Sequence, residues 1–230
     1  MTGSVAAVIP AAGTGSRLGS RTPKPLVKLG ADPMFIRTIR RLLSAYPFSR
    51  VILAVNPRSR AAMLKWVRKS RLKGIEVVAG GKTRAESVRN GLERLNGEKY
   101  VLIHDVARPF VGVEEVRELI RQARKDGASI LALKATATVK EINPRDRRIR
   151  RTLDRDRIYL AQTPQVFRTA LLKGAYARLG KRFARFTDEA GMIEEIGGRV
   201  TVVEGSSLNI KITTPGDLAV AQAMLGRRKS

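Results

Sequence analysis

Short runs of apolar and β-branched residues recur along the chain, and stretches with a helical pattern separate them. The runs predict buried strands, and the stretches between them predict helices that cover these strands. Six runs are the strand candidates: Val5–Pro10, Arg50–Asn56, Ile75–Gly80, Tyr100–Val106, Ser129–Lys134 and Arg199–Glu204. Strands that alternate with helices in this way form a doubly wound, mainly parallel sheet with helices on both faces, so we expect an α/β fold.

Local signals mark where several helices begin and end. Asp32 and Asn56 each stand before a proline, which places an N-cap residue ahead of a proline at the first helical position. Thr83 and Glu86 have the spacing of a capping box, and Thr214-Pro215 opens the last helix in a similar way. Glycines stand where four helices are expected to stop: Gly74, Gly127, Gly180 and Gly197.

The alternation continues without a linker or an internal repeat, so residues 1–230 are expected to form a single domain. A chain of 230 residues is long enough to bury a substantial core. In an open parallel sheet, ligands bind beyond the carboxyl ends of the strands. We therefore expect the functional residues in the loops that follow the strands.

One segment, from about residue 135 to residue 159, breaks the alternation. Two strand-like runs, Ala135–Ile142 and Arg147–Leu153, flank the turn residues Asn143–Asp146. This pattern predicts a β-hairpin arm that projects from the sheet. Because a two-stranded arm has little core of its own and is marginal in water, we expect it to pack against a second copy of the chain in a homodimer.

Composition is that of a globular protein, with 43% hydrophobic residues. No apolar run approaches the roughly 20 residues that a membrane span requires. The sequence has no cysteine, which excludes disulfides, thiolate metal sites and thiol catalysis. The N-terminus has no basic region and no cleavable apolar stretch. We therefore expect a cytoplasmic protein that has no membrane partner.

The charge is unusual, because 45 Lys and Arg against 20 Asp and Glu give a formal net charge of +25. Such a chain attracts phosphates of any kind, from nucleic acid to a triphosphate, so a basic nucleic-acid-binding module is an alternative to an enzyme. Against it, the basic residues are spread over several predicted helices, and no basic stretch carries the interleaved aromatics of a single-strand platform. The basic run 58–73 is typical of an amphipathic helix with a solvated face. We expect no specific nucleic-acid partner.

The first predicted strand leads into a glycine-rich loop, Pro10–Gly19, whose small residues let backbone N–H groups approach and cradle phosphates. Two known motifs do not fit, since a dinucleotide-binding fingerprint needs a glycine where Leu18 stands and a P-loop needs Gly-Lys-Ser/Thr. Arg17 lies inside the loop and Lys24 just after it. Two cations beside a phosphate cradle suit the charge that builds on a phosphoryl group during transfer. The alternative is a bare strand-to-helix turn with surface cations.

A second candidate site, His104-Asp105-Val-Ala-Arg108-Pro109, follows an apolar strand. Asp105 lies where an open sheet places its functional groups, and its carboxylate could meet magnesium or sugar hydroxyls. We interpret His104, the single histidine, as structural, because neighbours on a strand face opposite sides. No second histidine or nearby carboxylate pair suggests a metal site made by the protein. Mg²⁺ is therefore expected to arrive with a triphosphate.

Taken together, these segments resemble the 2-C-methyl-D-erythritol 4-phosphate cytidylyltransferase family of the non-mevalonate isoprenoid route. The first segment alone marks only the wider nucleotidyltransferase superfamily, whereas the whole series is far more specific. The matching segments are Ala11–Arg17, Pro23-Lys24, Gly80-Gly81, Arg84–Val88, His104–Pro109, Thr152–Arg155, Thr163–Phe167, Thr187–Ala190 and Asn209–Thr213. The resemblance implies a Rossmann-like nucleotidyltransferase that transfers the cytidylyl group of CTP to a small polyol phosphate and releases pyrophosphate.

The resemblance also implies a role for each matching residue. Arg17 and Lys24 would bind the triphosphate and stabilise the charged transition state. Asp105 would face the ribose and the acceptor, while Arg155 and Lys211 would hold the acceptor phosphate. The nucleotide would meet Ala11, Ala12, Gly13, Gly15, Gly81 and Ser87. The acceptor would also meet Arg108, Thr138, Thr163 and Thr187. Residues 135–159 correspond to the family's dimerisation arm, so Thr138 and Arg155 would serve the neighbouring subunit's site.

The sequence departs from the family pattern in two places. The usual Pro-Lys-Gln after the loop is Pro23-Lys24-Pro25, and the usual Asp-Thr in the arm is Ala137-Thr138. The first change hardly touches the chemistry because Lys24 is present, whereas the second concerns recognition of the polyol. The nearest alternative is a ribitol 5-phosphate cytidylyltransferase, followed by the hexose-phosphate nucleotidyltransferases that Pro25 favours.

Overall fold

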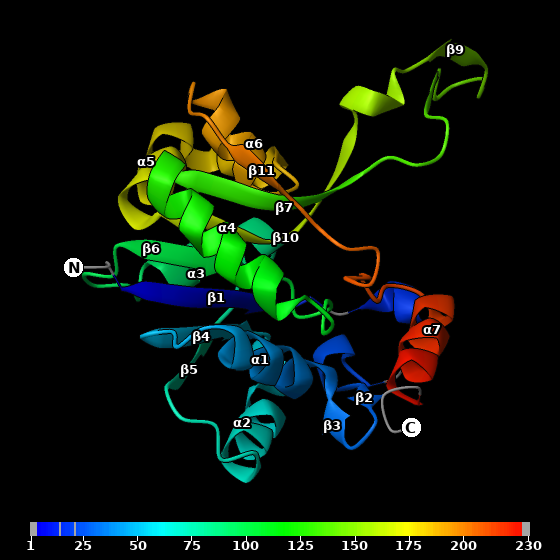
Figure 1. The fold of residues 1–230 in the computed structure, drawn as a ribbon. Coiled ribbons are helices and arrows are strands. Elements are labelled where there is room, and N and C mark those ends of the chain that lie inside the picture. Colours follow the sequence, from blue (N-terminus) through cyan, green and yellow to red (C-terminus); the bar gives the residue numbers. More distant parts are fainter. Residues whose placement is uncertain (1–3, 14, 21, 227–230) are drawn as a thin grey trace.

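The computed structural model of the chain describes residues 4–13, 15–20 and 22–226. Within these residues, seven strands form one sheet in the order β11-β7-β10-β6-β1-β4-β5 (Figure 1). These strands are β1 (Val5–Ala11), β4 (Arg50–Val55), β5 (Ile75–Ala79), β6 (Tyr100–Ile103), β7 (Ala128–Lys134), β10 (Tyr159–Arg168) and β11 (Thr201–Glu204). Strands β6, β1, β4 and β5 are parallel, as are β7 and β11, whereas β10 is antiparallel to both of its neighbours. The predicted mainly parallel α/β sheet is confirmed.

Strand β10 was not predicted from the sequence. It begins at Tyr159, where the arm was expected to end. Pro164 lies inside it, and the pairing with β7 shifts its register on either side of that residue. A proline within a run argues against a central strand, because it cannot donate to the ladder. Burial of Val166 and Phe167 in the two cores nonetheless places β10 in the middle of the sheet.

Helices cover both faces of the sheet (Figure 1). Their bounds are α1 (Met34–Ala45), α2 (Arg60–Lys69), α3 (Arg84–Leu92), α4 (Val113–Asp126), α5 (Thr169–Leu179), α6 (Glu189–Glu195) and α7 (Pro215–Gly226). Helices α1, α2 and α4 share one apolar core, and α3, α5 and α6 share another. Strand β1 shows why two cores form: Ala7 and Ile9 join the first core, and Ala6 and Val8 join the second. Alternate residues of a strand face opposite sides, so a continuous apolar run fits a strand that is covered on both faces.

Several of the helix caps that the sequence predicts are present in the structure. The Asn56 side chain accepts a hydrogen bond from the Arg58 N–H just before α2. Thr83 and Glu86 form the predicted capping box at the start of α3. Gly127 ends α4 with a φ of 92°, a left-handed conformation that glycine adopts without steric cost.

The predicted cap at Asp32 is wrong. Pro33 is the N-cap residue of α1, and Asp32 belongs to the short strand β3 (Asp32–Pro33), which pairs with β2 (Lys28–Leu29). The Asp32 carboxylate forms an ion pair with Arg40 in the second turn of the helix. Because the carboxylate is paired with Arg40, it accepts no hydrogen bond from the free N–H groups in the first turn of the helix.

The predicted arm is present as an antiparallel hairpin of β8 (Lys140–Ile142) and β9 (Ile149–Thr152). It projects well away from the sheet, and a short turn at Arg155–Arg157 leads back to β10 (Figure 1). Every residue of β9 is exposed, and Ile149 is 63% exposed. The hairpin prediction is therefore confirmed, whereas its role in dimerisation stays a prediction.

A third, smaller apolar cluster connects the last helix to the loops at the carboxyl edge of the sheet. It includes Leu18, Ala107, Ile212 and Ala221, the last of these on α7. The Ile212 N–H also donates to the Ala107 carbonyl at 2.9 Å. This contact places the segment around Lys211 beside the loop that follows β6. None of the helices in the described part of the chain combines the length and the apolar character needed to cross a membrane.

Candidate active site

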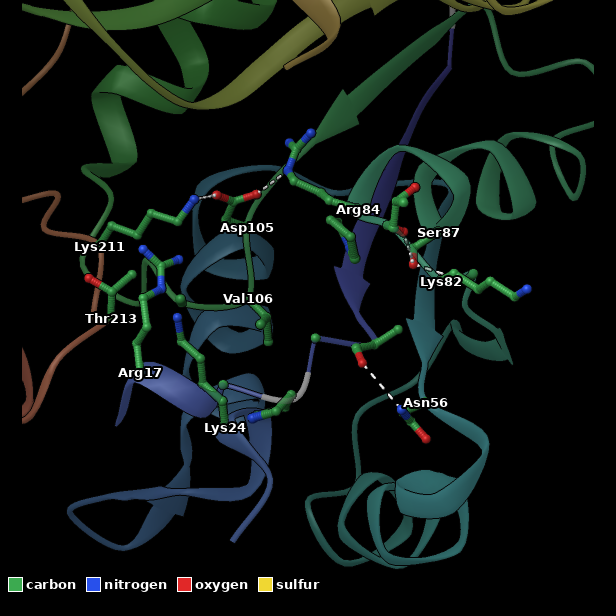
Figure 2. A pocket seen from close by; sticks show the side chains of 18 residues that line it. Arg17, Lys24, Asn56, Lys82, Arg84, Ser87, Asp105, Val106, Lys211 and Thr213 are labelled. Atoms are coloured by element: carbon green, nitrogen blue, oxygen red, sulfur yellow. Dashed lines mark hydrogen bonds and ion pairs between the residues drawn. The ribbon is translucent and has the colours of Figure 1, made fainter. Parts of the chain in front are cut away.

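A cleft of about 480 Å³ opens at the carboxyl edge of the sheet (Figure 2). The loops after β1, β4, β5 and β6 line it, together with the segment that precedes α7. Among the described residues of its wall, Asp105 is the single acidic one, and the basic ones are Arg17, Lys24, Lys82, Arg84 and Lys211. The cleft is therefore suited to an anionic ligand.

Gly15 brings the glycine-rich loop against Lys24. Its φ of +72° is left-handed, and a Cβ at this position would lie 2.4 Å from the Cβ of Lys24. Only glycine satisfies both conditions. Leu18 and Pro25 are buried and anchor the short turns that carry Arg17 and Lys24. Both cations point into the cleft (Figure 2).

The pKa of the Lys24 ammonium group is lower than that of an exposed lysine. Burial is the main cause that lowers its pKa to about 8. The positive charges of Lys211 and Arg17 lower this pKa further, and the negative charge of Asp105 opposes them. A bound phosphate would favour the charged form of the ammonium group and raise the pKa again.

The loop between β5 and α3 is shaped by its own hydrogen bonds. The Ser87 hydroxyl accepts from the Gly81 N–H at 3.1 Å and donates to the Thr83 carbonyl at 2.9 Å. Gly80 lies so close to Ala12 that a Cβ on this glycine would be 2.5 Å from the Cβ of Ala12. The backbone segments of two neighbouring loops thus approach each other at the wall of the cleft.

Of the other residues predicted to meet the nucleotide, Ala12 and Gly13 line the cleft. Ala11 does not line it, because this residue is the buried end of β1 and its side chain belongs to the first core. The lining residues Asn56, Lys82 and Thr213 were given no role in the site from the sequence. Asn56 donates through Nδ2 to the Ala12 carbonyl at 3.4 Å and so connects the loops after β1 and β4.

Asp105 is held through both of its carboxylate oxygens. Oδ1 accepts from Nε of Arg84 at 2.8 Å, and Oδ2 lies 2.6 Å from Nζ of Lys211 (Figure 2). The Asp105 N–H donates to Oγ1 of Thr163 at 3.0 Å. Burial raises the pKa of this carboxyl, but the charges of Arg84 and Lys211 outweigh burial and hold the pKa well below its usual range. Asp105 is therefore a fixed anion at neutral pH.

His104 is buried behind the cleft. Its Nε2 lies 2.9 Å from the Arg108 carbonyl, and its Nδ1 lies 3.1 Å from Oγ1 of Thr163. Burial lowers the pKa of His104 to about 4, so the ring is neutral at physiological pH. This histidine connects the loop after β6 to β10, which is a structural position.

A smaller cavity of about 160 Å³ adjoins the cleft. The two cavities share Arg84, Asp105 and Lys211. The residues predicted to meet the acceptor that line this cavity are Arg108, Thr163, Thr187 and Lys211. With Asp105, the fold thus brings together residues from separate parts of the chain that the family resemblance assigned to one substrate.

Two other residues predicted to meet the acceptor lie elsewhere. Thr138 and Arg155 belong to the arm, and neither lines the cleft or the smaller cavity. Arg155 instead donates through Nη1 to the Thr136 carbonyl at 3.1 Å, within the arm itself. One chain therefore assembles the candidate site without the residues of its own arm.

Sequence reasoning assigned no role to Arg84 and did not single out Glu189. Arg84 is bonded through Nη1 to both carboxylate oxygens of Glu189, each at 2.9 Å, and Glu189 is fully buried. One signal was present, because Arg84 stands in the first turn of a predicted helix, where the helix dipole disfavours a cation. An arginine at such a position indicates an anionic partner, but nothing local identifies that partner.

Comparison with known proteins agrees with this geometry. The model of the 2-C-methyl-D-erythritol 4-phosphate cytidylyltransferase family matches residues 5–227. A relative of that name from Geobacillus kaustophilus (strain HTA426) is 37% identical over 223 residues, which cover 96% of this chain and 97% of the relative. Another of the same name, from Syntrophus aciditrophicus (strain SB), is 40% identical over 231 residues, which cover 98% of this chain and 97% of the relative.

The solved structures lead to the same family. The crystal structure of 4-diphosphocytidyl-2C-methyl-D-erythritol synthase from Anaerococcus prevotii DSM 20548 is similar to this chain with a TM-score of 0.86 at 31% identity. The similarity covers 99% of this chain and 100% of that one. Sequence and fold agree over nearly the whole length, and the chain belongs to the 2-C-methyl-D-erythritol 4-phosphate cytidylyltransferase family.

Proposed function

We propose that this chain transfers the cytidylyl group of CTP to 2-C-methyl-D-erythritol 4-phosphate in isoprenoid biosynthesis, giving 4-diphosphocytidyl-2-C-methyl-D-erythritol and pyrophosphate. The observation that supports this most directly is the pair of adjoining cavities that share Asp105. One carries the cations suited to a triphosphate, and the other carries phosphate and hydroxyl partners. Two polyanions can bind there with their reacting groups close together. Family membership supports the identity of both substrates.

The chemistry requires positioning and electrostatic stabilisation. An oxygen of the acceptor phosphate attacks the α-phosphorus of CTP, a P–O bond forms, and the bond from that phosphorus to the bridging oxygen of pyrophosphate breaks. The acceptor phosphate is already an anionic nucleophile at neutral pH, so no general base is required. Lys24 and Arg17 would stabilise the charge that develops as pyrophosphate leaves, and Lys211 would orient the acceptor.

Recognition of cytosine would rest on the loops after β1 and β5. Peptide groups at Gly81 and Ala12 border the cleft beside Ser87, and they can bond to the polar edge of a pyrimidine. A larger purine would have to fit the same close approach between Gly80 and Ala12. This steric argument favours CTP over ATP and GTP.

We infer a homodimer in which each arm completes the partner's site. The arm leaves Ile149 in solvent, and Tyr159 and Leu160 at its base are 44% and 56% exposed. Apolar residues exposed along one projecting element indicate a surface that another chain covers. The arm also carries Thr138 and Arg155 away from the cleft of its own chain, so a partner's cleft is where they would act.

Mg²⁺ is expected to accompany CTP. No group of three or more His, Cys, Asp or Glu residues suited to a metal occurs among residues 4–13, 15–20 and 22–226. Asp105, the single carboxylate on the described wall of the cleft, already has both oxygens engaged. These donors fit an ion held mainly by the phosphates of the nucleotide. When bound, it would neutralise part of the charge on the triphosphate.

We also propose a cytoplasmic location, where nucleotides are abundant.

One assay tests the proposal. Pyrophosphate release is measured with CTP, UTP, ATP or GTP, each paired with methylerythritol phosphate or ribitol 5-phosphate at matched magnesium. We expect the highest kcat/KM for CTP with methylerythritol phosphate. Discrimination between the two polyols is expected to be about 1–3 kcal/mol unless a buried partner is left unpaired. A clear preference for ribitol 5-phosphate would establish the alternative acceptor. No turnover with any pair, together with specific binding of nucleic acid, would favour a binding module.

A further inference from the structure

Asp105 has a series of partners behind it that the proposed chemistry does not use. Arg84 contacts Asp105 through Nε at 2.8 Å and both oxygens of Glu189 through Nη1 at 2.9 Å. Arg84 opens α3 and Glu189 opens α6, so this contact connects two helices on the same face of the sheet. With Lys211 included, four charges of alternating sign follow one another from the cleft into the interior.

Tyr176 on α5 forms the inner end of this series. Its hydroxyl lies 3.1 Å from the Ala85 carbonyl and 3.4 Å from Oε1 of Glu189. The side chain is buried, and its ring lies 5.2 Å from that of Phe183 between centroids. Tyr176 therefore contacts both Glu189 and the first turn of α3, the turn from which Arg84 extends.

A buried carboxylate at the position of Glu189 is costly by itself. Burial raises the pKa of Glu189, and the charge of Arg84 opposes that rise. Buried ion pairs contribute little net stability, because well-packed apolar side chains of similar volume often stabilise a protein as well or better. Such a pair does fix the orientation of its members. In the pair of Arg84 and Glu189, Arg84 has a second contact, with Asp105 in the cleft.

We propose that Glu189 and Tyr176 are positioning residues for the acceptor substrate: through Arg84 they fix Asp105, and Asp105 fixes Lys211. The inference rests on the proposed function, which assigns the acceptor phosphate to Lys211. Neither Glu189 nor Tyr176 lines the cleft or the smaller cavity, so neither touches a substrate. The cations assigned to the triphosphate extend from other loops. Loosening this series should therefore weaken binding of the acceptor more than binding of CTP.

Tyr176→Phe tests the proposal with the least disturbance, because it keeps the buried ring and removes the hydroxyl. We expect the KM for the acceptor to rise about 3- to 10-fold, the effect of one lost hydrogen bond, while kcat changes little and the KM for CTP rises less. Tyr46→Phe is the matched control. Its hydroxyl accepts from Nη2 of Arg124 at 2.7 Å on the opposite face of the sheet, so all three constants should keep their wild-type values.

Glu189→Gln keeps the shape of the side chain and removes the charge that faces Arg84. We expect a larger rise in the KM for the acceptor, on the order of 10-fold or more, because the lost contact is charge-assisted. Removal of one partner of a buried pair can prevent folding, so thermal unfolding is measured in parallel. If this variant does not fold, Tyr176→Phe alone decides the question.

The outcomes separate the two proposals. A lower kcat in Tyr176→Phe with both KM values unchanged would show a merely structural role and overturn the inference, as would three unchanged constants. Wild-type protein that turns over neither acceptor would overturn the proposed function and this inference together. Wild-type activity combined with the selective rise in the KM for the acceptor supports both.

Discussion

Nζ of Lys211 lies 2.6 Å from Oδ2 of Asp105, although the two residues come from separate parts of the chain. Asp105 follows β6 near the centre of the sheet, and Lys211 belongs to the segment between β11 and α7. Both residues line the cleft and the smaller cavity, so their contact lies where the two substrates are expected to meet. A lysine already held by a fixed carboxylate loses less freedom when an anion binds.

Removing either cation of the glycine-rich segment should slow the reaction without unfolding the protein. We expect Lys24→Ala and Arg17→Ala each to lower kcat on the order of 10²-fold or more, because each charge matters most as pyrophosphate leaves. Steady-state kinetics and thermal unfolding check this. Lys65→Ala removes an exposed charge on α2 and serves as the control. Near-wild-type turnover in both cleft variants would contradict the assignment.

The pH dependence of catalysis should report the charge of Lys24. Its pKa of about 8 means that the ammonium form, which the transition state needs, is lost as pH rises through that value. We expect kcat/KM for CTP to be level below this pKa and to fall above it, because this parameter reports the free enzyme. The fall in kcat should come at higher pH, since a bound triphosphate raises the pKa.

Lys24→Arg supplies the matched comparison for this pH profile. A guanidinium stays charged at all relevant pH values, so the alkaline fall in kcat/KM should move to higher pH even if the maximal rate is lower. A fall at unchanged pH in Lys24→Arg would mean that another group titrates there.

Gly15→Ala should impair catalysis through Lys24. Alanine at this position would have to adopt a φ of +72°, and its Cβ would meet the Cβ of Lys24 at 2.4 Å. Gly19→Ala is the matched control, because Gly19 has a φ of +66° but nothing lies within 4 Å of a Cβ there. We expect about tenfold or greater loss of kcat in the first variant only. Equal losses in both would attribute the effect to backbone strain.

Mixing inactive variants tests whether the arm acts on the partner's site. Arg155→Ala removes the residue of the arm and Lys24→Ala removes the cation of the cleft, and we expect each variant alone to be nearly inactive. If each site combines one chain's cleft with the other chain's arm, a heterodimer of the two variants retains one intact site. We therefore expect activity to return when the two inactive proteins are mixed and exchange subunits. Exchange demonstrated with differently tagged chains, without recovered activity, would rule out a shared site.

Sequence reasoning succeeded where a few adjacent residues decide the outcome. Continuous apolar runs identified the parallel strands, because a strand covered on both faces has no polar side to show. The capping box at Thr83 and the left-handed glycine Gly127 could be predicted because such caps are local contacts. Strand β10 was missed because Pro164 breaks the local pattern, and only burial between β6 and β7 makes that segment a strand.

The α/β class, the arm, the glycine-rich loop and the cations Arg17 and Lys24 could be predicted from the sequence, because each depends on residues close together in the chain. Which charges meet could be seen only once the chain was folded. Arg84 finds Glu189, and Lys211 finds Asp105, across long sequence separations. The charge of a residue says what partner it needs, but the partner is set by which loops the sheet brings to the same edge. Electrostatic contacts act over a few ångströms of space, and sequence distance does not enter their energy.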